Sequence, residues 1–127
     1  MTRYFDTIAE FERDGFDIIV DKTWDDTDPW DQLSECFDDK RKLYNDIDSG
    51  KYEWFMLRVR VLVEGHELAT EWLGGCLYED AREVMTDGVA EDMIQEALAA
   101  AKKDVYRLSK KFAELSEMVD KQGLSAV

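Results

Sequence analysis

The sequence predicts an α+β fold: a small, mostly antiparallel sheet of about three strands covered by helices, with a long C-terminal helix. Two stretches lead to this prediction. Residues 52–76 hold an alternating apolar run, a turn and a second apolar run, which is typical of a β-hairpin. Residues 89–121 carry apolar side chains at helical spacing. Because an isolated hairpin is unstable, other segments must cover its apolar face.

The chain length fits a single domain over residues 1–127. The chain has one proline and no serine- or glycine-rich linker, so no domain boundary is expected. It shows no basic-then-apolar leader and no apolar run near about 18 residues, so we expect neither secretion nor a membrane span. A cytoplasmic location is therefore expected. Cys36 and Cys76 are expected to stay reduced there.

The N-terminal third predicts a helix followed by a strand. Apolar residues from Tyr4 to Phe11 are spaced for a short amphipathic helix over Asp6–Arg13, and Gly15 is a natural stop for it. Residues 16–24 alternate between apolar and polar and predict the first strand.

Two helices are expected before the hairpin. Asp28 is a candidate N-cap with Pro29 at the first helical position, in a helix that turns three large side chains inward (Trp30, Leu33 and Phe37). A short charged helix from about Asp39 to Ile47 follows, and Ser49-Gly50 ends it.

The hairpin itself comprises a strand over residues 54–63, a tight turn over Glu64–Glu67, and a strand over residues 68–73. The Gly74-Gly75 pair is expected to end this second strand. Trp54 and Trp72 are expected mainly to pack in the core.

The C-terminal part predicts a short helix over Tyr78–Met85 and a long one from Val89 to about Lys121. Apolar residues of the long helix form a heptad seam, which continues from Ile94, Leu98 and Ala101 into Val105, Leu108, Phe112, Leu115 and Val119. A helix of 33 residues is about 50 Å long, longer than a compact domain of this size. The helix therefore either breaks near Ser109 or overhangs and pairs with another chain as a homodimer, unless the whole seam lies on its own sheet.

Charge is the dominant compositional feature. The chain carries 30 acidic and 16 basic residues, a formal net charge of −14. Residues 14–39 contain ten acidic residues and one basic residue, Lys22. Residues 64–99 contain ten acidic residues and one basic residue, Arg82. This balance disfavours direct nucleic-acid binding, since nucleic acid is itself a polyanion.

Three interpretations of the acidic blocks are open. One is a solvated acidic surface. A second is a calcium loop, but the residues from Asp26 onward place Trp30 and Asp31 where an EF-hand needs an oxygen ligand and glycine. A third is a mimic of nucleic acid, whose carboxylates occupy a basic groove in a partner protein. The candidate partner-binding acids of this face are Asp25, Asp26, Asp28, Asp31, Glu35, Asp38, Asp39, Glu79, Asp80, Glu83 and Asp87. Trp24, Trp30 and Tyr78 are candidate contacts at its rim.

Three sequence segments resemble a recurring type of small acidic bacteriophage protein: the run from Tyr52 to Val61, Leu-Gly-Gly-Cys at 73–76, and Tyr-Glu-Asp-Ala-Arg-Glu-Val at 78–84. Small acidic phage proteins include DNA-mimicking antirestriction and anti-CRISPR inhibitors of host defence. The resemblance implies a host nuclease or CRISPR effector as the target and assigns no individual site residue.

No catalytic motif is present. His66 is the only histidine and lies in the expected hairpin turn, at the opposite end of its strand from Cys76. We find no P-loop, no dinucleotide-binding glycine triplet and no zinc-binding motif, so we expect no enzyme activity, no cofactor and no metal. The leading hypothesis is a non-enzymatic inhibitor that blocks a basic DNA-binding surface. The alternative is a dimeric structural or scaffold phage protein that uses the heptad seam, with its acidity serving solubility.

Overall fold

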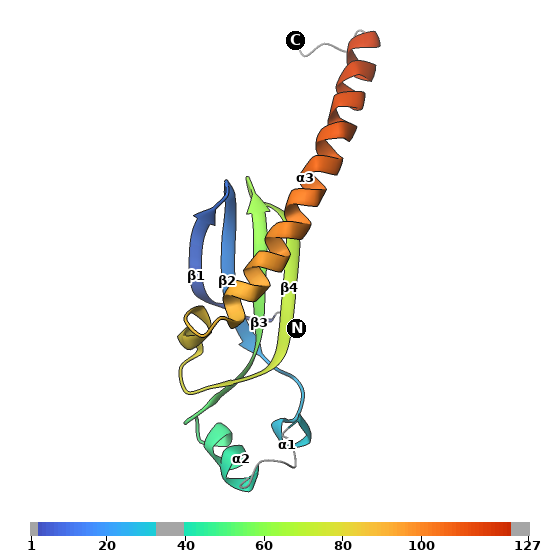
Figure 1. Ribbon diagram of the computed structural model, residues 1–127. Helices are drawn as coiled ribbons and strands as arrows, with labels where there is room; N and C mark the ends of the chain where they lie inside the picture. Colours follow the sequence, from blue (N-terminus) through green and yellow to red (C-terminus); the bar gives the residue numbers. More distant parts are fainter. Residues whose placement is uncertain (1–2, 33–39, 123–127) are drawn as a thin grey trace.

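The computed structural model describes residues 3–32 and 40–122, which form a four-stranded antiparallel sheet and one long helix (Figure 1). The strands follow chain order, β1-β2-β3-β4, each paired with its neighbour in sequence. Their bounds are Asp6–Arg13 for β1, Phe16–Trp24 for β2, Glu53–Val63 for β3 and His66–Tyr78 for β4. The predicted α+β class is confirmed, with four strands where about three were expected.

The helices lie on one face and at one end of this sheet. Short helices α1 (Pro29–Gln32) and α2 (Lys40–Asp48) lie beyond the end where β2 stops and β3 begins (Figure 1). A 3-10 helix, η1 (Ala81–Met85), leads into α3 (Val89–Lys121). Helix α3 crosses one face of the sheet and continues past its edge (Figure 1).

The core lies between this sheet face and the first half of α3. Alternate residues of the two central strands are buried there: Phe16, Ile18, Val20, Phe55, Leu57, Val59 and Val61. Helix α3 contributes Ala90, Met93, Ile94, Ala97, Leu98 and Ala101. Burying a large aliphatic side chain stabilises the fold by about 1.5–3 kcal/mol, so this single layer holds the helix on the sheet.

The opposite sheet face carries a buried ion pair. Asp21 is 2% exposed, and its carboxylate accepts hydrogen bonds from Nε of Arg58 at 2.8 Å and from Nη2 at 2.6 Å. The Arg58 guanidinium lies 3.5 Å from the centre of the Phe5 ring, and Trp72 is also close. Trp72 is 50% exposed, so the expectation that it mainly packs in the core is wrong.

The predicted helix over Asp6–Arg13 is wrong, because this segment is strand β1. A register shift between Thr7 and Ala9 marks a β-bulge, which breaks the two-residue alternation and leaves apolar residues at helix-like intervals. Gly15 does not end a helix. Together with Asp14 it forms the β1–β2 turn, and their φ angles of +85° and +56° suit a two-residue hairpin.

The Gly74-Gly75 pair was predicted to end a strand, yet β4 continues through it to Tyr78. These residues form a bulge opposite β3, where Phe55 pairs with Cys76 and Leu57 pairs with Leu73. Gly75 has a φ of +66°, which glycine adopts without strain. The helix predicted over Tyr78–Met85 is consequently shorter, because only Ala81–Met85 is helical.

The remaining helix predictions are largely confirmed. Asp28 caps α1 by accepting a hydrogen bond from the Trp30 amide at 2.9 Å. Of the three positions predicted to turn inward, Trp30 is 36% exposed, so that prediction is wrong for Trp30, and Leu33 and Phe37 lie outside the described residues. Helix α3 runs unbroken, which excludes the alternative of a break near Ser109. Its seam is buried only as far as Ala101, which also rules out a seam lying wholly on its own sheet.

Candidate acidic binding site

The described candidate acids of residues 25–31 and of residues 79–87 lie at the same end of the sheet, where β2 and β4 end and β3 begins (Figure 1). The described acids of this end are Asp25, Asp26, Asp28, Asp31, Glu79, Asp80, Glu83 and Asp87. Glu35, Asp38 and Asp39 lie outside the described residues. The antiparallel order of the strands brings together two segments that are about fifty residues apart in the chain. We refer to the eight described residues as the acidic end.

Asp25 ties the loop after β2 to the glycine bulge of β4. Its carboxylate accepts hydrogen bonds from the Thr27 hydroxyl at 2.6 Å, the Thr27 amide at 2.9 Å and the Gly75 amide at 2.7 Å. Burial raises the pKa of Asp25, but the hydrogen bonds from Thr27 and Gly75 outweigh burial and leave the pKa below its usual value. A Cβ at Gly74 would lie 3.1 Å from this carboxylate, so glycine lets the two segments approach closely.

Asp26 is the neutralised member of this loop. It forms an ion pair with Arg3 and accepts a hydrogen bond from the Trp24 indole at 2.5 Å. The Arg3 guanidinium also lies 5.2 Å from the Trp24 ring centre. This arrangement leaves Trp24 43% exposed at the rim of the acidic end.

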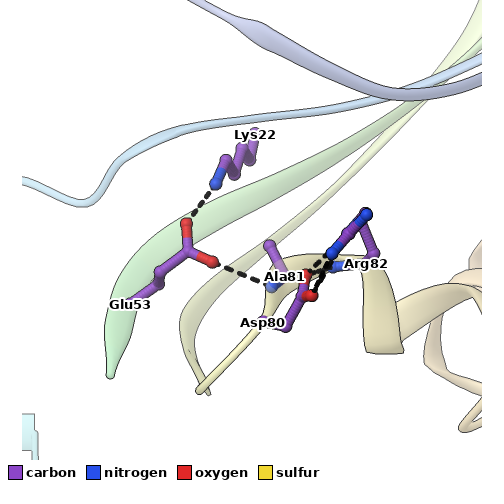
Figure 2. Close-up of polar contacts among 5 residues, drawn as sticks. All are labelled: Lys22, Glu53, Asp80, Ala81 and Arg82. Carbon is purple, nitrogen blue, oxygen red and sulfur yellow. Dashed lines mark hydrogen bonds and ion pairs between the residues drawn. The ribbon is translucent and has the colours of Figure 1, made fainter. Parts of the chain in front are cut away.

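The second acidic segment is fixed by η1 (Figure 2). Asp80 caps this helix by accepting a hydrogen bond from the Arg82 amide at 2.9 Å, and it pairs with the Arg82 guanidinium at 2.6 Å. These bonds lower the pKa of Asp80 to about 2. Glu53 at the start of β3 accepts a hydrogen bond from the Ala81 amide at 2.8 Å and pairs with Lys22 (Figure 2). The β2 and β3 strands therefore hold η1 at the sheet end.

Asp87 fixes the junction between η1 and α3. One carboxylate oxygen accepts a hydrogen bond from the Val89 amide at 2.9 Å, and the other accepts one from the Tyr78 hydroxyl at 2.5 Å. Burial and this bond raise the pKa of Tyr78, so the phenol remains a donor. A carboxylate at this position also faces the positive end of the α3 dipole.

The four other acids of this end are exposed: Asp28, which caps α1, and Asp31, Glu79 and Glu83. Within residues 3–32 and 40–122, only Asp26 and Asp80 of the acidic end form an ion pair. Basic residues are also present at this end, because α2 begins with Lys40-Arg41-Lys42. The Lys40 ammonium lies 4.4 Å from the centre of the Trp30 ring. The acidic end is thus a set of positioned carboxylates with a basic border.

The sequence did not indicate Glu53, which organises this region, or Asp21, which pairs with Arg58 on the sheet face opposite the core. Glu53 and Asp21 were not among the predicted site residues, and both pair with a base on a neighbouring strand. The available signal was the placement of each acid on the same sheet face as its base, Lys22 or Arg58, in the alternating pattern of β2 and β3. Recognising this placement requires the strand register.

The described cysteine and the histidine are not placed together. Cys76 is buried, and burial raises the pKa of its thiol to about 11. His66 pairs with Val63 at the other end of β4, far along the strand from Cys76. Among residues 3–32 and 40–122, no group of three or more histidine, cysteine or acidic residues is arranged to hold a metal ion. Cys36 lies outside these ranges.

The predicted seam residues of α3 lie beyond the sheet. Val105 is 41% exposed, Phe112 60%, Leu115 40% and Val119 40%, while Leu108 is half-buried. The structure therefore separates the acidic end and the exposed seam, which occupy opposite ends of the molecule (Figure 1).

None of the described helices is both long enough and apolar enough to cross a membrane, α3 included. Comparison of the chain with protein-family models, with curated proteins and with solved structures found no match.

Proposed function

We propose that this chain is a non-enzymatic inhibitor whose acidic end binds the basic, nucleic-acid-binding surface of a host defence protein, as an antirestriction or anti-CRISPR protein does. The observation that supports the proposal is the gathering of two distant acidic segments at one sheet end. A surface of closely spaced carboxylates attracts the Lys and Arg side chains that otherwise contact phosphates.

Rigidity adds to this support. Asp25, Asp80 and Asp87 each accept a hydrogen bond from a backbone amide, so their positions are set by the fold. Preorganised groups lose little conformational entropy on binding. The exposed indoles of Trp24 and Trp30 supply the kind of side chain that anchors protein interfaces.

The test reverses only those acids that the fold does not use. The variant Asp31→Lys, Glu79→Lys, Glu83→Lys alters three exposed side chains. The matched control reverses three exposed acids toward the opposite end of the sheet (Glu12→Lys, Glu64→Lys and Glu67→Lys). Both triple variants lose six units of the −14 formal charge, so they differ only in where the charge is removed.

Wild type and both variants are immobilised, exposed to a bacterial lysate, and eluted with stepped salt. We expect the acidic-end variant to lose the salt-eluted partner, with affinity falling at least about tenfold at 0.1 M salt, while the control retains it. The retained protein is then assayed for DNA binding with and without each variant. Equal retention by the two variants, or a captured protein whose DNA binding is unaffected, contradicts the proposal.

The alternative, a dimeric structural or scaffold phage protein, is favoured by the exposed seam of α3. Replacing Leu108 and Phe112 with Glu separates the two functions. Loss of self-association with retained inhibition supports mimicry, whereas loss of both supports the scaffold. Circular dichroism establishes that the variant remains folded.

A further inference from the structure

The half of α3 beyond the sheet carries an unpartnered apolar stripe. Residues 102–121 span about 30 Å of helix at 1.5 Å per residue. The stripe is the seam from Val105 to Val119, widened by Met118, which is 52% exposed. A single helix in water gains little stability from its own hydrogen bonds, so an apolar stripe of this length is typical of a helix with a packing partner.

The stripe continues into a groove beside the β3–β4 turn. The groove has a volume of about 460 Å³. One side is formed by the hairpin residues Val63, His66 and Leu68, and the other by Val105, Leu108 and Phe112 of α3. Apart from His66 and Ser109 its lining is aliphatic or aromatic. An occupant of the stripe therefore also meets the end of the sheet.

Charge identifies the occupant. Residues 102–121 hold six basic and four acidic residues, whereas the rest of the chain holds ten and 26. Two copies of this helix segment can therefore meet without strong repulsion, although the chain as a whole is acidic. Its own charges are also divided, because residues 102–111 hold five bases against Asp104, and residues 112–121 hold three acids against Lys121.

We propose that the projecting half of α3 pairs antiparallel with the same segment of a second copy. The basic part of each helix then lies along the acidic part of the other. The C-terminal part of the second copy's seam, Leu115 and Val119, covers the groove between α3 and the hairpin.

The antiparallel direction follows from two considerations. A parallel pair places two basic parts side by side, and it also brings together two sheets that carry most of the negative charge. In an antiparallel pair the sheets lie at opposite ends of a helical segment about 30 Å long. That separation exceeds the screening length of about 8 Å at physiological salt, so the acidic bodies repel each other little.

Sedimentation equilibrium tests the pairing on the full chain, whose monomer mass is 14.8 kDa. We expect a concentration-dependent dimer for wild type. Phe112→Glu places a charge in the seam, whereas Ala113→Glu adds the same charge to an exposed residue on the adjacent face. The first variant is expected to weaken the dimer by at least about 100-fold and the second by less than about threefold. A wild type that stays monomeric at about 100 μM, or equal effects of the two variants, overturns the proposal.

The direction of pairing has its own test. The variant Glu114→Lys, Glu117→Lys, Asp120→Lys makes the whole projecting segment basic, although it lowers the net negative charge of the chain. Antiparallel pairing predicts a dimer weakened about tenfold at low salt, because the basic part now meets a basic part. In a parallel pair the same substitutions only replace two acidic parts that repel each other with two basic parts that repel each other, so a weakening of less than about threefold overturns the assignment of direction.

A compensating variant completes this test. It adds Arg107→Glu, Lys110→Glu and Lys111→Glu to the first three substitutions, which reverses the division of charge along the helix. Restored dimerisation is the expected result. Each variant also changes ion pairs within the helix, so far-UV circular dichroism is used to verify that every variant compared is folded.

Discussion

Replacing Arg58 is expected to destabilise the protein more than any surface charge change, because the buried carboxylate of Asp21 loses its main partner. The side chain of Asp21 is 3% exposed and that of Arg58 is 14% exposed. Removing one partner of a buried pair costs about 3–5 kcal/mol, since the remaining charge loses its compensation. Arg60 lies 3.9 Å from the same carboxylate and retains part of the attraction. We therefore expect Arg58→Met to lower the free energy of unfolding by about 3 kcal/mol.

Urea denaturation followed by circular dichroism measures this loss. With a denaturant slope of about 2 kcal/mol per molar, the midpoint falls by about 1.5 M. The double variant Asp21→Val, Arg58→Met removes both charges, and its stability is expected to lie within about 1 kcal/mol of wild type. Arg107→Met serves as the surface control. Its ion pair with Asp104 is exposed, so its loss is expected to cost no more than about 0.5 kcal/mol.

Two results would refute the reasoning about this pair. One is a loss below about 1 kcal/mol for Arg58→Met, which would mean that water or Arg60 compensates the carboxylate fully. The other is a double variant as unstable as the single one. In that case the lost packing of the Arg58 side chain against Phe5 would be the cause.

Three further outcomes are expected. Gly65 has a φ of +78°, and no atom lies within 4 Å of the place where a Cβ would project. Gly65→Ala should therefore lower the free energy of unfolding by about 1 kcal/mol through backbone strain alone, measured as a shift in the urea midpoint. The pKa of Asp80 is lowered to about 2, so its charge contributes stability above the unfolded pKa of about 3.9, and this contribution is lost as the pH falls through about 2. Acid titration of Asp80→Asn should therefore show a smaller loss of stability between pH 4 and pH 2 than wild type, and an identical loss would contradict this role. In a Cys36→Ser background, Cys76 should react with a disulfide reagent at pH 7.5 only after unfolding, because burial raises its pKa to about 11; rapid labelling of the folded protein would contradict its burial.

The parts of the fold that were predictable are those where one periodicity runs without interruption. Strands β2 and β3 alternate regularly, and α3 keeps its heptad spacing from end to end, so their positions were predicted correctly. The errors fall at two bulges. The shift near Ala9 imitates helical spacing, and the Gly74-Gly75 bulge imitates a strand end. A bulge is defined by the partner strand, which the local sequence does not contain.

The candidate site was predictable in composition and not in arrangement. The sequence shows two acidic segments, but only the strand order places them at one end. Which carboxylates are paired with a base also had to come from the structure, because Arg3, before β1, pairs with Asp26 after the adjacent strand β2, and Arg82 folds back on Asp80. How much of the α3 seam is exposed depends on where the helix leaves the sheet, and its fully buried residues end at Ala101.

The long segment that connects β2 to β3 is held in place by contacts near its two ends. The Trp54 indole donates a hydrogen bond to the Thr27 carbonyl at 3.2 Å, and Asp25 holds the Gly75 amide. The cost of closing a loop grows only slowly with its length. Sequence changes between Pro29 and Tyr52, including insertions, can therefore reshape the surface next to the acidic end while the sheet keeps its register. The fold thus permits the chemistry of this surface to change without loss of stability.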